Sequence, residues 1–103
     1  MYPNALEEVA MRVWNKRDPN TPKNAVYIGR PSKYGNPYIL GLHGDRDRVI
    51  AWHMAWVRQR LQGDPHWLDD LLAVEDVVCF CAPLACHGDN YAILVEEMKN
   101  DMT

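Results

Sequence analysis

One stretch near the C-terminus, residues 77–89, most constrains the fold: it reads VVCFCAPLACHGD and holds all three cysteines. A short apolar run bounded by turn residues is typical of a buried strand, which predicts a strand over Val77–Cys81. Pro83 ends this strand, because proline lacks the N–H that a sheet needs. Asp89 is a favourable cap for a helix predicted over Asn90–Lys99. A strand, a tight loop and a helix N-terminus together predict a site for an anionic ligand.

A second loop, rich in Pro and Gly, covers residues 29–38 and follows a strand predicted over Ala25–Ile28. The predicted order of helix, strand, helix, helix, strand, helix favours an α/β fold with a small, mainly parallel sheet and flanking helices. If the two main strands are parallel, both end on the same edge of the sheet. The loops 29–38 and 82–89 should then meet at that edge, where open α/β sheets usually bind ligands.

Hydrophobic spacing and capping residues predict the other elements. An amphipathic helix is expected over Ala5–Lys16, after a capping residue at Asn4. The apolar residues of 39–42 predict a short edge strand. A long helix is predicted over Asp45–Gln62, and a short one from Pro65 to about Ala73.

The composition, with 103 residues, 48% hydrophobic residues and a net charge of −3, is that of one folded domain. Within this domain of residues 1–103, we expect an N-terminal helix and loop over 1–24 and an α/β core over 25–99. The absence of a general basic excess argues against nucleic acid as a partner. The cysteine spacing is not that of a disulfide framework, and no apolar run has the length of a membrane span, so a cytoplasmic protein without membrane contact is expected. The modest core of so short a chain leaves room for a homodimer.

The pattern Cys-x-Cys-x4-Cys-His allows a metal site, because Cys79, Cys81, Cys86 and His87 could supply the four N or S ligands that zinc takes. However, zinc sites usually pair their cysteines across a turn, and two cysteines on one strand fit that pattern poorly. Free cysteine is also among the most buried residue types. We therefore expect structural thiols with no disulfide and no required metal or cofactor, and zinc is the alternative.

The same segment supplies candidate catalytic residues. A thiol at a helix N-terminus, such as Cys86, can act as a nucleophile. His87 can move protons near neutral pH, with Asp89 as its orienting partner. In the structural alternative, His87 is a turn residue with a satisfied side chain, and Asp89 is a helix cap or the ion-pair partner of Arg30.

Candidate ligand-binding residues come from both loops. Arg30 and Lys33 bring positive charge, and arginine suits a bidentate contact to phosphate. Ser32 and Asn36 bring hydrogen-bonding groups, and backbone N–H groups at Gly88 could face a phosphate. In the hypothesis that follows, Arg30 and Lys33 hold the anion and Asn36 orients the ligand.

The long predicted helix carries further polar residues with a structural explanation. His53 lies at the edge of the apolar stripe, which favours a satisfied histidine at a packing interface. The arginines lie mostly off that stripe and are expected on a solvated face. These are Arg46, Arg48, Arg58 and Arg60.

Two segments resemble the paired signatures of a small family. They are VYIGRPSKYGNP at residues 26–37 and CFCAPLACHGD at residues 79–89. The chain is similar there to a domain of unknown function that is common in bacteriophages and bacteria and is marked by Gly-Asn-Pro and Cys-His-Gly. The resemblance covers about Val26 to Met98, with Phe80 where tryptophan is expected. It implies a phage or bacterial intracellular setting and a shared pocket at Arg30, Lys33, Gly35, Asn36, Pro37, Cys79, Cys81, Pro83, Cys86, His87, Gly88 and Asp89.

The leading hypothesis is a protein that binds a phosphorylated, nucleotide-like ligand between loops 29–38 and 82–89, as a candidate hydrolase or transferase. The alternative is a non-enzymatic phage accessory protein that binds a host protein through a Trp-rich surface. Its Cys/His motif would then be structural or zinc-binding. Polar side chains that converge on an open cleft would favour the first hypothesis, and a filled interface of packed thiols the second.

Overall fold

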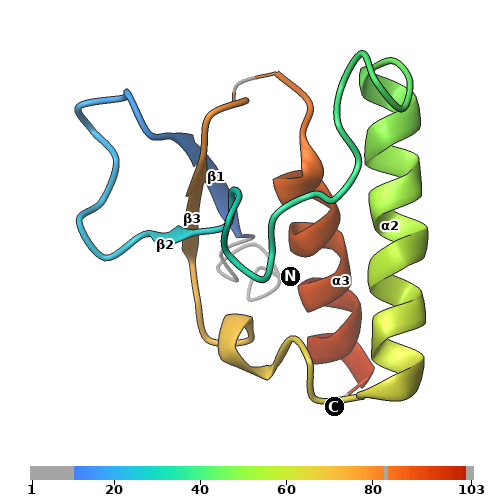
Figure 1. Ribbon diagram of the computed structural model, residues 1–103. Coiled ribbons are helices and arrows are strands. Elements are labelled where there is room, and N and C mark those ends of the chain that lie inside the picture. The colour runs from blue at the N-terminus through green and yellow to red at the C-terminus, as the bar shows by residue number, and fades with distance from the viewer. Residues whose placement is uncertain (1–10, 83, 102–103) are drawn as a thin grey trace, which may run out of the picture.

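The computed structural model describes residues 11–82 and 84–101 (Figure 1). The elements, in chain order, are β1 (Arg12–Asn15), β2 (Val26–Tyr27), α2 (Arg46–Gly63), the 3-10 turn η1 (Asp69–Leu71), β3 (Asp76–Cys79) and α3 (His87–Asp101). The three strands form one sheet in the order β1-β3-β2, and both pairs are parallel. The predicted α/β fold with a small parallel sheet is therefore confirmed.

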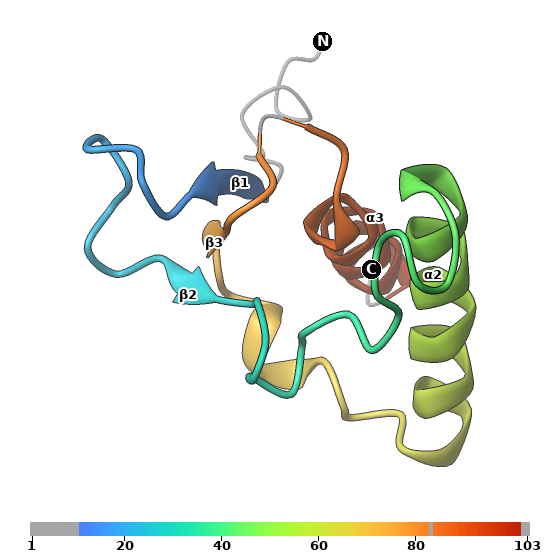
Figure 2. The ribbon, with the colours of Figure 1, turned by 45° about the horizontal axis from the view of Figure 1, so that its top comes forward.

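The sheet and the two helices lie in successive layers (Figure 2). Helix α3 packs on the sheet, and α2 packs against α3. The two helices run in the same direction, and both begin at the end of the molecule where β3 ends (Figure 1). Two helix N-termini and the carboxyl end of the central strand thus lie at one end of the fold.

Side chains alternate across the sheet, as the pleat requires. Val77 and Cys79 belong to the core cluster beneath α3. On the opposite face, Asp76 accepts hydrogen bonds from Arg12 Nε and Trp14 Nε1, each at 2.8 Å. Because Arg12 is paired with Asp76 in the strand register, this ion pair links neighbouring residues of β1 and β3.

The helix predicted over Ala5–Lys16 is wrong in the part that the structure describes, because Arg12–Asn15 form β1. Residues 5–10 lie outside the described residues. The Arg12 N–H donates to the Glu75 carbonyl at 2.8 Å, and the Lys16 N–H donates to the Cys79 carbonyl at 2.7 Å. A four-residue run fits a helical and an alternating pattern equally well, so this long-range pairing decides its structure.

The predicted elements of the middle region were partly correct. The long helix is confirmed, and Asp45 caps α2 by accepting a hydrogen bond from the Arg48 N–H at 2.9 Å. The edge strand predicted over 39–42 is wrong, because Leu40 forms only an isolated bridge with Gly44. The short helix expected from Pro65 is reduced to η1, which still buries Leu71.

The motif near the C-terminus is arranged differently from the prediction. The strand ends at Cys79 and not at Cys81, so Cys81 lies in the bend that follows. Pro83 lies outside the described residues. Helix α3 begins at His87, three residues before the predicted start, and therefore includes Asp89 in its first turn.

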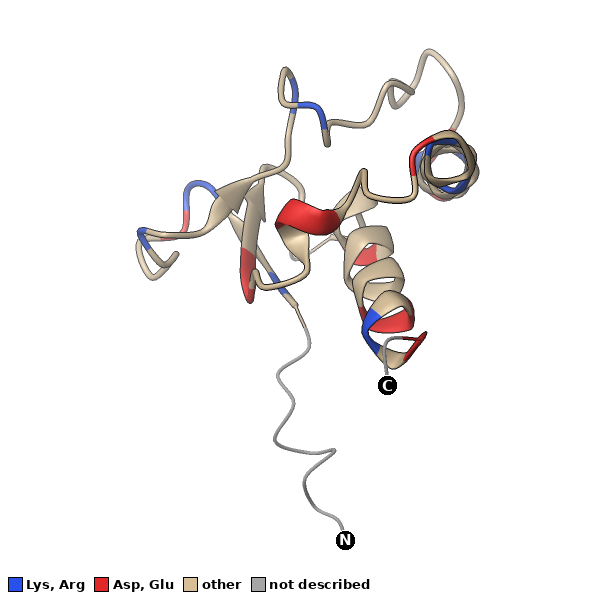
Figure 3. Ribbon diagram, turned by 90° about the horizontal axis from the view of Figure 1, so that it is seen from below, with Lys and Arg blue, Asp and Glu red and all other residues tan. Residues whose placement is uncertain are grey.

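Charged residues are spread over the fold (Figure 3). Basic residues lie on the loop between β1 and β2, on the loop after β2 and on α2, with acidic residues among them. Because neither sign of charge dominates a region, attraction of an anion by this protein must come from a few local groups.

None of the described helices is long and apolar enough to cross a membrane.

Candidate functional site

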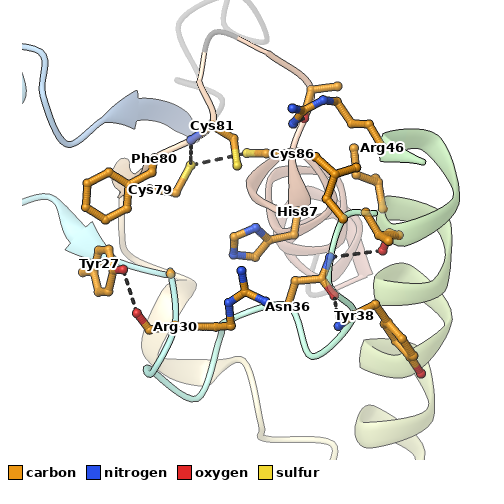
Figure 4. A pocket seen from close by; sticks show the side chains of 15 residues that line it. Tyr27, Arg30, Asn36, Tyr38, Arg46, Cys79, Phe80, Cys81, Cys86 and His87 are labelled. Carbon is orange, nitrogen blue, oxygen red and sulfur yellow. Dashed lines mark hydrogen bonds between the residues drawn. The ribbon is translucent and has the colours of Figure 1, made fainter. Parts of the chain in front are cut away.

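A cavity of about 410 Å³ opens at the end of the fold where the two helices begin (Figure 4). This volume lies in the range of about 300–1,000 Å³ that is usual for small-molecule sites. The loop after β2, the loop after β3 and the first turns of α2 and α3 surround it. The polar and aromatic residues that line it are Arg30, Asn36, Arg46, His87, Cys79, Cys81, Cys86, Tyr27, Tyr38 and Phe80.

The two motif loops meet here because α3 binds the start and the middle of the first loop. His87 Nε2 lies 2.7 Å from the carbonyl oxygen of Ile28, at the end of β2. The Tyr91 hydroxyl donates to the carbonyl oxygen of Tyr34 at 2.8 Å. Helix α3 therefore fixes the loop that carries Arg30.

Arg30 presents a guanidinium group to the cavity without a partner among the described residues. Its carbonyl oxygen accepts a hydrogen bond from the Tyr27 hydroxyl at 2.8 Å, which fixes the backbone. Its side chain is exposed and makes no hydrogen bond or ion pair with any residue that the structure describes. The alternative pairing with Asp89 is not formed, since that carboxylate accepts from the Cys86 N–H at 3.1 Å.

Arg46 supplies a second cation from the first turn of α2. Its Nη1 donates to the Ala85 carbonyl at 3.0 Å and so joins α2 to the loop before α3. The sequence pattern predicted a solvated position for Arg46, but the residue lines the cavity. The arginine faces it because α2 and α3 are parallel and adjacent, which the sequence pattern did not reveal.

Three free cysteines form one side of the cavity. The sulfur atoms of Cys79 and Cys86 lie 3.5 Å apart. A hydrogen bond from Cys86 lowers the pKa of the Cys79 thiol, against the opposing effect of burial. The same bond and burial raise the pKa of Cys86. The contact between the two sulfurs therefore makes Cys79 the more acidic thiol of the pair.

Cys86 is also the N-cap of α3. Its sulfur accepts a hydrogen bond from the Gly88 N–H at 3.3 Å, while the Asp89 carboxylate accepts from the Cys86 N–H. This reciprocal arrangement is that of a capping box, with cysteine where serine or threonine usually stands. Asp89 does not line the cavity, so its contacts are those of a helix cap.

The two buried histidines differ in their hydrogen bonding. His53 is completely buried, with Nε2 3.2 Å from the Tyr91 hydroxyl and Nδ1 3.0 Å from Asn90 Nδ2. Burial, with a smaller contribution from His87, lowers the pKa of His53 to about 3. His53 is thus a satisfied interface histidine, as predicted. His87 donates through Nε2 to the Ile28 carbonyl, and its Nδ1 has no hydrogen bond among the described residues.

Two of the predicted ligand-binding residues lie away from the cavity. The Ser32 hydroxyl accepts a hydrogen bond from the Tyr34 N–H at 3.3 Å. The Lys33 ammonium lies 5.1 Å from the centre of the Tyr34 ring and 5.3 Å from that of Trp67. Neither residue lines the cavity. In these positions both residues stabilise the loop and its packing.

Asn36 lines the cavity as predicted and Gly88 does not, and the fold uses the polar groups of both residues. Asn36 lines the cavity, while its Nδ2 donates to the Val49 carbonyl at 3.1 Å and its Oδ1 accepts from the Tyr38 N–H at 2.9 Å. Gly88 is buried, and a Cβ added there would lie 2.8 Å from Val13 Cγ1. Gly88 therefore allows α3 to approach the sheet closely.

The aromatic residues at the cavity were not predicted as site residues. Tyr27 and Phe80 form an edge-to-face pair with 6.2 Å between ring centroids, and Phe80 is 51% exposed. Tyr38 contacts the ring of Trp52 in the same geometry. The available signal was that Tyr27 ends β2 and Phe80 directly follows β3, at the shared edge of the sheet.

The comparisons with known proteins give one result for the whole fold. The family model described as Domain of unknown function (DUF4326) matches residues 11–97. This match includes β1, whereas the resemblance seen in the sequence began only at Val26. Neither the comparison with curated proteins nor that with solved structures gave a match.

Proposed function

This chain belongs to the family described as domain of unknown function DUF4326, and we propose that it binds a phosphorylated, nucleotide-like ligand in the cavity between its two motif loops. The observation that carries the proposal is the guanidinium of Arg30 in that cavity, which has no partner among the described residues. A planar guanidinium offers paired N–H donors that match a phosphate group.

The surroundings of Arg30 support this ligand class. Arg46 adds a second positive charge, and the N-terminus of α3 adds the favourable end of a helix dipole. The three free cysteines on the other side of the cavity bring no positive charge, so the phosphate belongs on the Arg30 side. The rings of Tyr27 and Phe80 offer apolar surface to a planar base.

The same arrangement supports a reaction on the bound ligand, either hydrolysis or group transfer. His87 is 7% exposed and lines the cavity, and in the neutral ring its Nδ1 can accept a proton. Figure 4 shows His87 between Arg30 and the cysteines. In the proposed mechanism Arg30 holds the phosphate and His87 removes a proton from the attacking group. Asp89 accepts a hydrogen bond from the Cys86 N–H at the start of α3, so it takes no direct part in this proton transfer.

A second candidate is a non-enzymatic accessory protein that binds a host protein. It is favoured by the exposed apolar side chains at the cavity, where Leu40 is 50% and Phe80 51% exposed. A Trp-rich surface is a weaker basis, because Trp56 and Trp67 pack edge to face and are half-buried. The open cavity with converging polar side chains favours the small ligand.

The test is a thermal-shift screen of the full chain with nucleoside mono-, di- and triphosphates, the free nucleosides and inorganic phosphate. A ligand at about 100 times its Kd stabilises the folded state by about 2.7 kcal/mol. We expect a shift with a nucleotide and none with its nucleoside. Arg30→Lys should weaken binding about tenfold or more, because the bidentate contact is lost.

Lys33→Ala is the matched control, because it also changes a basic residue of the first loop but lies outside the cavity. It should leave nucleotide affinity unchanged. The proposal is refuted if no phosphorylated ligand shifts the melting temperature, or if Arg30→Ala binds as tightly as the unmodified chain. Capture of a host protein by a chain that binds no nucleotide would support the second candidate.

A further inference from the structure

The sulfur atoms of Cys79, Cys81 and Cys86 all lie within 4.8 Å of one another, and two of them are 3.5 Å apart. In a tetrahedral zinc site with Zn–S bonds of about 2.3 Å, neighbouring sulfurs are about 3.8 Å apart. The cluster therefore needs only small side-chain movements to take this geometry. We propose that these three cysteines bind a zinc ion whose fourth position opens into the cavity beside His87.

The chain geometry removes the sequence argument against a metal. That argument placed Cys79 and Cys81 together on a strand, but β3 ends at Cys79. Cys81 comes from the bend, and Cys86 is the residue immediately before α3. Three different backbone environments thus direct their sulfurs to one point (Figure 4). This proposal departs from the expectation that no metal is required.

The N-cap residue of α3 is a cysteine, which supports a role for its sulfur beyond capping the helix. Serine, threonine, aspartate and asparagine are the favoured N-cap residues, because their oxygen accepts strongly from the first N–H groups of a helix. Cys86 makes this contact through sulfur at 3.3 Å. Capping alone would be served better by serine, whereas a thiolate is a zinc ligand that serine cannot replace.

The burial of the thiols also fits a bound cation. Cys79 and Cys86 are almost fully buried, and their sulfurs contact each other. Zinc binding requires three thiolates and releases their protons, and the ion neutralises most of the resulting charge.

The fourth position faces the cavity, because all three cysteines line it. A site with three protein ligands and one open position can coordinate water or a ligand atom. The His87 ring lies at this side (Figure 4), and its Nε2 is already held by the Ile28 carbonyl. Its Nδ1 is thus available beside the open position. This inference does not depend on the proposed nucleotide, since the metal can be measured alone.

The test uses the purified full chain. We expect about one zinc per chain by elemental analysis, and cobalt(II) in its place should give the intense visible absorption of a tetrahedral thiolate site. Cys86→Ser is the sharpest variant: serine retains the cap, so the helix content should be unchanged, while stoichiometric zinc is lost. His87→Ala should keep the zinc and the tetrahedral cobalt spectrum. Phe80→Ala is the control, because it changes the same loop without removing a ligand.

The zinc site is refuted if the metal-free chain takes up no zinc in competition with a weak chelator, or if Cys86→Ser binds zinc as the unmodified chain does. Loss of zinc in His87→Ala would refute the open fourth position. If Cys86→Ser does not fold, thiol titration replaces it: zinc should protect three thiols from modification until a chelator is added. Three thiols that react equally with and without zinc would refute the site. Zinc binding without nucleotide binding would leave this inference intact while the proposed function fails.

Discussion

Removal of the Tyr91 hydroxyl tests how α3 holds the first motif loop, and it changes no residue that lines the cavity. It donates to the Tyr34 carbonyl at 2.8 Å and accepts from His53 Nε2 at 3.2 Å. Tyr91 and His53 are fully buried, and Tyr34 is 7% exposed. In Tyr91→Phe the ring stays in place, but the carbonyl oxygen and the imidazole N–H lose their partner.

The size of the effect follows from these two groups. A buried polar group without a partner costs about 1–3 kcal/mol. The His53 bond is long, so we take the lower part of the range and expect the free energy of unfolding to fall by about 2–4 kcal/mol. His53 cannot relieve the loss by moving its proton to Nδ1, because that atom accepts from Asn90 Nδ2, which also lies 2.8 Å from the Ile50 carbonyl.

The assay is urea unfolding followed by tryptophan fluorescence, where an unchanged m value shows that only stability has changed. Tyr38→Phe is the control, since the Tyr38 hydroxyl has no hydrogen bond among the described residues; its effect should stay within about 0.5 kcal/mol. If Tyr91→Phe changes stability as little as the control does, these hydrogen bonds do not hold the first loop on α3, and the reasoning is refuted.

Further predictions test the helix start, the buried histidine and the α2 cap. Gly88→Ala should lower the unfolding free energy by about 1–3 kcal/mol, because the new Cβ would contact Val13; a stabilised variant in urea unfolding would contradict this. The pKa of His53 is lowered from 6.5 to about 3, so between these values the unfolded chain binds a proton that the folded chain does not. Stability should thus be complete above about pH 6.5 and fall by up to about 1.4 kcal/mol per unit as pH decreases toward 3, and His53→Gln should flatten the slope between about pH 7 and 5. An unchanged slope would show that other groups cause the acid sensitivity. Asp45→Ala should cost about 0.5–2 kcal/mol through loss of the cap, whereas Asp45→Ser should cost less, as urea unfolding can show.

The elements that could be predicted from the sequence are those whose signal is local. Helix α2 has a capping aspartate at Asp45 and apolar residues at helical spacing along its length. The predicted first residue of this helix therefore differs from the observed one by a single position. The Val77–Val78 run is apolar and β-branched, which identified β3. Both signals depend on neighbouring residues alone.

The elements that were missed depend on distant parts of the chain. Strand β1 exists because Val13 and its neighbours pair with residues 64 positions away, and a strand of four residues is too short for its alternation to be distinctive. Arg46 could not be assigned to the cavity, since its place follows from the packing of α2 beside α3. By contrast, Arg30, Cys86 and His87 follow β2 and β3, and chain order together with the expected parallel pairing of these strands placed them at one edge.

The contrast between His53 and His87 shows how a structural residue is distinguished from a candidate functional one. The rings lie 5.1 Å apart, and both are buried. The fold uses both nitrogens of His53, whereas the described residues use one nitrogen of His87. The same distinction separates Lys33, whose ammonium covers two aromatic rings, from Arg30, whose guanidinium contacts no described partner. His87 Nδ1 and the Arg30 guanidinium, both without a hydrogen bond among the described residues and both at one cavity, are therefore the two groups on which the proposed ligand site depends.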